Sequence, residues 1–180
     1  MAGIIKVNQY QDFNGNTILT SDGSGNLTTQ EILYPAFHVK LSADQTVSEN
    51  TFTKVAYDHV FLDTHNGFST STYRYTCPTG KSGNYFIGGL VLFDGQANTI
   101  LNYADLYIYK NTVIHSYQIT QFNANPVRQH SHQFGVIMNL SDGDYVEIHG
   151  RGDKTNANNL VFRGDTQKEE TRFFGYRLGS

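Results

Sequence analysis

The sequence predicts an all-β protein, a sandwich or jelly roll of roughly eight to ten strands. Three observations support this prediction. The chain has 12 Tyr and 12 Phe, and aromatic residues favour the pleated, half-buried surface of a sheet. It has 17 Gly against 3 Pro, and Gly beside Asn or Asp marks tight turns. Its apolar residues nowhere keep a helical spacing for long, so no helical layer is expected.

Residues 1–34 differ in composition from the rest of the chain. The segment "DFNGNTILTSDGSGNLTTQEIL" is rich in Gly, Asn, Ser and Thr, and its apolar runs allow only brief strands. Asn14-Gly15 predicts a hairpin, and residues 21–26 are typical of a turn or linker. A segment this thin cannot bury a core, so we expect it to dock onto another copy or a larger assembly.

Residues 35–180 carry a recurrent strand signal. Turn clusters such as "DTHNG" and "LSDGD" separate β-prone runs at short intervals, as in a sandwich domain. The runs are, in chain order, "AFHVKL", "FTKVAY", "HVFLD", "TYRYTC", "NYFIGGLVLF", "DLYIYKNTVIHSYQITQF", "HQFGVIMNL", "DYVEIHG", "NLVFRG" and "RFFGYRLG".

Several of these runs are apolar on both faces of the predicted strand. In "RFFGYRL" one face carries Phe173 and Gly175, and the other carries Phe174, Tyr176 and Leu178. In a monomeric sandwich the outer face of each sheet is exposed to solvent and is polar. An apolar outer face therefore predicts that a neighbouring subunit covers it. The residues expected in the core or the subunit interface are Tyr85, Phe86, Phe173, Phe174, Gly175 and Tyr176.

The composition argues against several classes of function. The 13 basic and 16 acidic residues give a net charge of −3, and no basic stripe is present to neutralise nucleic-acid phosphates. No apolar run approaches the roughly 20 residues that cross a bilayer, so no membrane insertion is expected. The first residues lack the pattern of a secretory signal. Cys77 is the single cysteine, which excludes an internal disulfide and favours a buried structural thiol.

The sequence does not predict an enzyme. It has no G-x-S-x-G elbow, no H-E-x-x-H helix and no phosphate-binding loop. Carboxylate pairs such as Glu169 and Glu170 fit a solvated loop better than acid–base chemistry. No catalytic residue and no organic cofactor are therefore expected.

Two groups of residues are candidate metal ligands. His130 and His132 lie two apart on one strand face, so three subunits meeting at an axis could join one imidazole each around zinc. The alternative is a pair of polar residues at a strand end. Asp142 and Asp144 could offer oxygen ligands to calcium, but "SDGD" also suits a tight turn between antiparallel strands, which we favour.

Loops rich in Tyr and Asn are candidates for binding a sugar or a protein, because Tyr offers a flat amphipathic surface at low entropic cost. Arg151-Gly152-Asp153 matches a cell-attachment triplet, but we expect it to be the turn by which the chain leaves the strand "DYVEIHG". The candidate ligand-loop residues are Asn66, Phe68, Tyr73, Arg128, Arg151 and Asp153.

Four motifs in residues 35–180 resemble the globular head of complement component 1q. They are Asp58 with Val60 followed by "NGF", then "YTCP" with "GNYF", then "LYIYKN", and finally "LSDGDYV" with the closing "RFFGYRLG". Thr112 replaces the Gly of the family's "K-N-G" turn, and Arg177 replaces an apolar residue. The resemblance implies a ten-stranded jelly roll shared with tumour necrosis factor, a compact homotrimer, and binding without catalysis. The collagen-like stalk of many relatives is missing.

Residues 1–34 are similar to the openings of bacteriophage fibre and virion-appendage proteins, especially those of cyanobacterial viruses. This resemblance implies a trimeric structural protein of the virion, made in the host cytoplasm, that acts as a fibre, neck or capsid appendage. The segment 1–34 would contact other virion proteins, and the head would be displayed outward toward a host glycan or protein. The alternative is a soluble binding module of the complement 1q type that is not tied to a virion.

Overall fold

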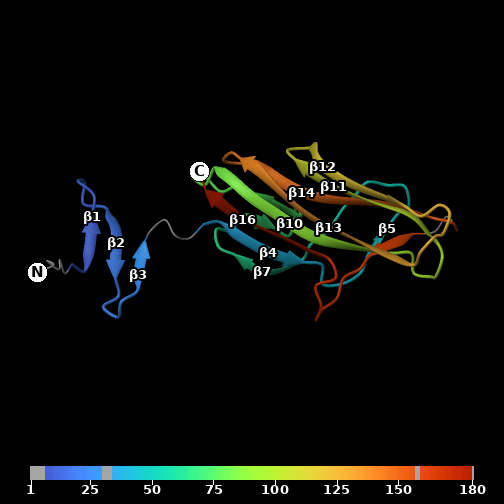
Figure 1. Cartoon of the computed structure of the whole chain (residues 1–180), viewed down its shortest axis with the longest axis horizontal. Coiled ribbons are helices and arrows are strands. Elements are labelled where there is room, and N and C mark those ends of the chain that lie inside the picture. Colours follow the sequence, from blue (N-terminus) through green and yellow to red (C-terminus); the bar gives the residue numbers. More distant parts are fainter. Residues whose placement is uncertain (1–6, 30–33, 157–158, 180) are drawn as a thin grey trace, which may run out of the picture. The chain divides into compact units, whose positions relative to one another are not determined.

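The computed structural model describes residues 7–29, 34–156 and 159–179 (Figure 1). Its regular elements are all β-strands, so the all-β prediction is confirmed, and within these ranges no helix is long and apolar enough to cross a membrane. The chain separates into two compact units, residues 1–34 and 35–180. We call the second unit the head.

The first unit is an antiparallel sheet in the order β1 (Gln9–Gln11), β2 (Thr17–Ser21), β3 (Leu27–Thr29). Its two turns are built in the same way, ten residues apart. In each, an aspartate side chain, Asp12 or Asp22, accepts hydrogen bonds from the backbone N–H groups two and four residues later. The Asn side chain four residues later also donates to the same carboxylate. The expected hairpin at residues 14–15 is the first turn, and residues 21–26 contain the second.

The head is a sandwich of two sheets, and both layers are visible in Figure 1. The first sheet has the order β5 (Gln45–Val47), β15 (Leu160–Phe162), β10 (Gly83–Asp94), β16 (Arg172–Gly179), β4 (Ala36–Lys40), β7 (His59–Asp63). Strand β13 (Gln129–Leu140) also belongs to this sheet and pairs with β10 from Gly83↔Leu140 to Asp94↔Gln129.

The second sheet has the order β12 (Val113–Gln121), β11 (Leu101–Lys110), β14 (Tyr145–Lys154), β9 (Arg74–Thr76), β8 (Phe68–Ser69), with β6 (Thr53–Lys54) also paired to β14. The β11–β12 turn places Asn111 and Thr112 at φ values of 49° and 70°, the left-handed region. Thr112 therefore adopts the conformation for which glycine is the usual residue. The sandwich is confirmed, whereas the count of ten strands stays a prediction, because segments as short as β6 and β8 occur at its margins.

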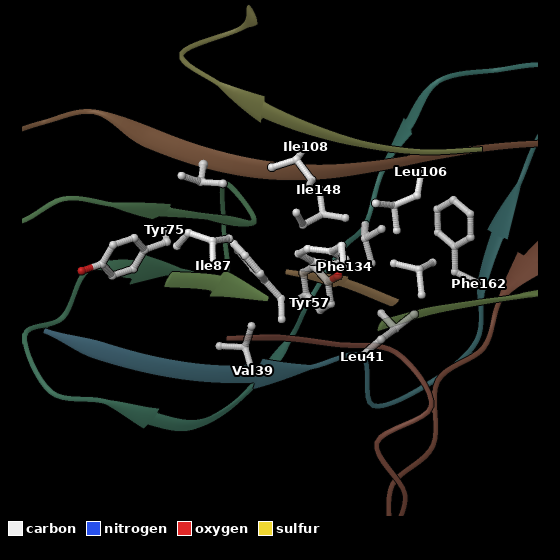
Figure 2. Close-up of a cluster of buried hydrophobic side chains, with 14 of the residues drawn as sticks. Val39, Leu41, Tyr57, Tyr75, Ile87, Leu106, Ile108, Phe134, Ile148 and Phe162 are labelled. Carbon is white, nitrogen blue, oxygen red and sulfur yellow. The ribbon is translucent and has the colours of Figure 1, made fainter. Parts of the chain in front are cut away.

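The core lies between the sheets and is dominated by aromatic and branched side chains. In Figure 2, Leu106, Ile108 and Ile148 of the second sheet lie near Ile87 and Phe134 of the first. Burying each such side chain contributes about 1.5–3 kcal/mol relative to exposure. The inward residues alternate along β14 and β13, as period-2 patterning requires.

Candidate functional site

The outer face of the second sheet concentrates tyrosines and charged groups. Alternate residues of β11 and β14 face outward, and antiparallel pairing sets Asp105 opposite Arg151 and Tyr107 opposite His149. Tyr117 of β12 lies opposite Tyr107 on the other side. We call this surface the tyrosine face; its residues are Phe52, Lys54, Arg74, Tyr103, Asp105, Tyr107, Tyr109, Tyr117, Tyr145, Glu147, His149, Arg151 and Asp153.

An ion pair holds the centre of the tyrosine face. The Asp105 carboxylate is 2% exposed, and its Oδ2 accepts hydrogen bonds from Nη2 of Arg151 at 2.5 Å and from Nε at 3.1 Å. The Arg151 guanidinium also lies 4.6 Å from the ring centre of Phe52 and 5.4 Å from that of Tyr103. Two aromatic rings and one carboxylate therefore hold the cation in one orientation.

A second charged group lies next to this pair. Glu147 accepts from Nζ of Lys54 at 2.5 Å through Oε1, and its Oε2 lies 3.2 Å from Nε2 of His149. Burial tends to raise the pKa of Glu147, but hydrogen bonds from Lys54 and His149 outweigh it and lower that pKa. Burial also lowers the pKa of His149, so its imidazole is neutral at physiological pH.

Asp153 forms a third group on the opposite side of the central pair. Its Oδ1 accepts from the Asn50 amide and its Oδ2 from the Asn102 amide, both at 2.9 Å. The Tyr103 hydroxyl in turn donates to the Asn50 side-chain oxygen. Burial raises the pKa of Tyr103, so its hydroxyl stays protonated as a donor. Both Asp153 oxygens are thus engaged inside the head.

The outer face of the first sheet is different, because it is mainly apolar. A groove of about 340 Å³ lies there, with Phe174 and Tyr176 of β16 on one side and Leu62 of β7 on the other. His38 crosses its floor, with Nε2 3.0 Å from Oε2 of Glu169. The groove lining consists of Ala36, Phe37, His38, Leu62, Glu169, Arg172, Phe174, Gly175 and Tyr176.

The residues predicted for the core or interface divide between two environments. Tyr85 and Phe173 are fully buried in the core. Phe86 and Phe174 face outward and are half-buried, and Tyr176 beside them is 45% exposed. Gly175 is buried where a side chain would collide with Phe37 and Ile87.

Of the two candidate zinc ligands, His130 lies half-buried at the start of β13, as the strand-end alternative expects, whereas His132 is buried two residues further along. His132 is buried in β13, with Nε2 2.8 Å from the Ala104 carbonyl oxygen and Nδ1 3.2 Å from the Gln118 side-chain oxygen. His130 packs edge-on against Phe122. Burial lowers the pKa of both imidazoles, and within residues 7–29, 34–156 and 159–179 no three His, Cys, Asp or Glu residues gather as a metal site.

The candidate calcium ligands are occupied with holding turns. Asp142 accepts hydrogen bonds from the Gly80 and Ser82 backbones and from the Ser82 hydroxyl, so it ties two turns together. Asp144 accepts from the Ser141 backbone, the Asn111 amide and Nζ of Lys110. These donors, Lys110 foremost, lower the pKa of Asp144 to about 2.

The structure corrects two expectations about the ligand loops. Arg151 and Asp153 do not form an exit turn, because β14 continues to Lys154 and stays paired with β11 at both residues. Phe68 is not a loop residue either, since it is the first residue of β8 and packs in the core, where its ring centre lies 6.1 Å from that of Phe37. Asn66 and Tyr73 do occupy turns with positive φ. Arg128 is exposed, with Nε 3.5 Å from Oδ1 of Asp94.

Sequence reasoning did not identify the tyrosine face as one surface, although part of its signal was readable. Tyr103, Asp105, Tyr107 and Tyr109 alternate along one run, and the odd-numbered residues of "YVEIHGRGD" alternate along another. The sequence alone does not show that these two rows lie on adjacent strands and face each other across the β11–β14 pair.

Comparison with known proteins shows the fold of the head. No family model matches the chain, and no curated protein matches it. The globular domain of the zebrafish complement 1qA protein is similar in structure, with a TM-score of 0.57, 17% identity, and coverage of 81% of this chain and 98% of that one. Murine APRIL is similar in its pH 5.0 structure, with a TM-score of 0.56, 12% identity, and coverage of 81% and 99%. The pH 8.5 structure of murine APRIL is similar as well, with a TM-score of 0.56, 13% identity, and coverage of 81% of this chain and 99% of that one. The head therefore has the jelly-roll fold of the complement 1q and tumour necrosis factor type.

Proposed function

We propose that this chain is a homotrimeric, non-enzymatic structural protein of a bacteriophage virion, a fibre, neck or capsid appendage whose head is displayed outward. The observation that carries the proposal is a pair of different apolar surfaces on one head. One is the groove over the first sheet. The other is the exposed edge strand β12 of the second sheet.

The two surfaces suit a closed ring of subunits. A ring uses heterologous contacts, in which one patch of each subunit meets a different patch of the next. The edge presents Val113, Ile114 and Ile119 of β12, with Val113 68% exposed, while Leu62 in the groove is 46% exposed. An unpaired apolar edge strand that is exposed to water promotes aggregation. Packing this edge against the groove of the next subunit would cover it.

The first unit supports attachment to a larger particle. Its described residues form a single three-stranded sheet, on which Tyr10, Phe13, Ile18 and Leu27 are exposed. A unit of this size buries too little apolar surface to be stable alone, so another layer is expected to cover it. Other virion proteins or the equivalent segments of the other two subunits would supply that layer. Its sequence likeness to virion-appendage openings gives the proposal its viral context.

A soluble binding module is the second candidate. The similar structures share the fold of the head alone, and they suit a free module equally well. The tyrosine face favours a binding role in either context, because its side chains lie on the sheet opposite the apolar groove. The two candidates differ in whether residues 1–34 have a partner on a particle.

Two measurements test this proposal. Multi-angle light scattering of the purified chain is expected to give three times the chain mass of 20.2 kDa, and a value near one chain mass would reject the trimer. Mass spectrometry of phage particles from cells producing the chain is expected to find it as a stoichiometric component. Its absence from particles, with the trimer intact, would leave the soluble module as the better account.

A further inference from the structure

We propose that the tyrosine face binds a neutral saccharide, centred on Tyr107, Tyr117 and Phe52 with Asp105 as an acceptor. This inference deepens the proposed role of the head at the host surface and rests on it for its biological setting. It names the face and the chemistry of the ligand, which the fold leaves open.

The aromatic rings form a platform with exposed edges and faces. Tyr107 is buried and stacks with Tyr117, with ring centres 5.9 Å apart and planes 27° apart. Phe52 meets Tyr107 on another side, edge-on, at 4.8 Å. Tyr117 is 61% exposed and Phe52 is 46% exposed. Exposed rings held by a buried one can stack on the C–H face of a sugar without losing side-chain freedom on binding.

The charges of this face almost cancel, which argues against an ionic ligand. The cations are Lys54, Arg74 and Arg151, and the anions are Asp105, Glu147 and Asp153, so three charges of each sign are present. Lys54 and Arg151 are bound to carboxylates, and Arg74 lies 4.2 Å from the ring centre of Tyr145. Glu49, which acts electrostatically on Tyr103, adds one negative charge at the rim. Such a surface does not attract polyanions, and it complements an uncharged, hydroxyl-rich molecule.

Carboxylate oxygens provide a second, independent indication of a ligand. Glu147 and Asp153 have both oxygens engaged, as described above. Asp105 is buried, and its Oδ1 has no hydrogen-bond donor among the described residues. Oε2 of Glu49 likewise has none there. An unpaired buried acceptor is costly, so a donor from outside the described chain, such as a water molecule, is expected there, and a water held by Asp105 can in turn hydrogen-bond a sugar hydroxyl.

The backbone keeps this arrangement rigid. Tyr107, Asp105 and Arg151 lie on β11 and β14, two long paired strands in the interior of the sheet, and Tyr117 lies on the adjoining β12. Sites carried on strands hold their geometry better than sites carried on loops. The groove proposed for subunit packing belongs to the other sheet, so Phe52, Asp105 and Arg151 stay available after assembly, whereas Tyr117 lies on β12, the strand whose edge is proposed to meet the groove of the next subunit.

A glycan array tests the proposal with the full chain. The probes are neutral hexose and N-acetylhexosamine oligomers, with heparin as a polyanion and chitosan oligomers as a polycation. We expect binding to at least one neutral oligomer, none to heparin, and little change in affinity between about 0.05 and 0.5 M salt. Tyr117→Ala and Phe52→Ala should each weaken binding about tenfold or more, as loss of a stacked ring predicts.

The matched control is Tyr10→Ala, because Tyr10 is a comparably exposed tyrosine in the first unit, at 51% against 61% for Tyr117. It should leave binding unchanged. Binding to heparin or chitosan alone, or full binding by Tyr117→Ala, would overturn the proposal. So would adsorption to bacterial cells that persists after periodate has oxidised their glycans, which indicates a protein partner. Light scattering on the same samples shows whether the trimer is intact. Loss of saccharide binding can therefore be distinguished from loss of assembly.

Discussion

Arg151 and Asp105, 46 residues apart in the chain, face each other across the β11–β14 pair, and two guanidinium nitrogens bind a single carboxylate oxygen. Arg151 is the first residue of the Arg-Gly-Asp triplet. The third residue, Asp153, accepts hydrogen bonds from the Asn50 and Asn102 amides with its two carboxylate oxygens. A docking triplet needs a free cation and a free carboxylate on a flexible loop. Here both charges are committed within a strand, so the triplet is a structural part of the tyrosine face.

Arg151→Ala is expected to destabilise the head by about 2–3 kcal/mol. The change leaves the Asp105 carboxylate buried without its cation, and the cost falls below that of a fully buried pair because Arg151 is 30% exposed. Urea denaturation of the two proteins measures the difference. The double variant Arg151→Ala with Asp105→Ala should recover part of the loss. A single variant as stable as the parent would contradict the importance of this pair.

Leu62→Glu is expected to convert the trimer into monomers. Leu62 lines the apolar groove, and a carboxylate there would be buried without a partner in any edge-to-face contact. The mass from light scattering should fall from three times the chain mass toward the 20.2 kDa of a single chain. Phe52→Glu is the matched control, because Phe52 is also 46% exposed but lies on the other sheet. Dissociation of both variants, or of neither, would place the interface elsewhere.

Gly175→Ala is expected to cost about 1–3 kcal/mol through overpacking. A Cβ at this position would lie 2.7 Å from Phe37 and Ile87 side-chain carbons and 2.9 Å from the Phe86 carbonyl oxygen. Gly179 on the same strand has open space around its Cβ position, so Gly179→Ala should be nearly neutral. Thermal unfolding of the two variants makes the comparison. Equal effects would mean that the contact with Phe37 and Ile87 relaxes freely.

Asp144→Asn is expected to remove a pH-dependent part of the stability. The Asp144 pKa is lowered to about 2 by Lys110, the Ser141 backbone and Asn111. A carboxylate with a lowered folded-state pKa stabilises the head fully above its unfolded value of 3.8 and loses this effect as pH falls through about 2. The difference between parent and variant in urea midpoint should therefore be largest near neutral pH and shrink below pH 4. A difference independent of pH would contradict this role.

Several features of the fold were accessible from the sequence because they depend on local physics. Alternation in "RFFGYRL" correctly separates the buried Phe173 from the outward Phe174 and Tyr176. Asn14-Gly15 marks a turn because glycine accepts the positive φ, here 83° at Gly15. His132 shows the limit of such reasoning. Its residue type suggests a ligand, whereas its burial beside Ala104 depends on packing between two sheets.

The sequence by itself determined the all-β class, the turns and the face on which each side chain of a strand lies, because period-2 alternation and turn chemistry act over a few neighbouring residues. Tertiary structure decided which rows of side chains meet. The opposition of Asp105 to Arg151 depends on the register of two strands that are distant in the chain. That register is set by the packing of the whole sandwich, and a one-residue slip would turn the outward rows into the core. The tyrosine face therefore exists only in the folded head.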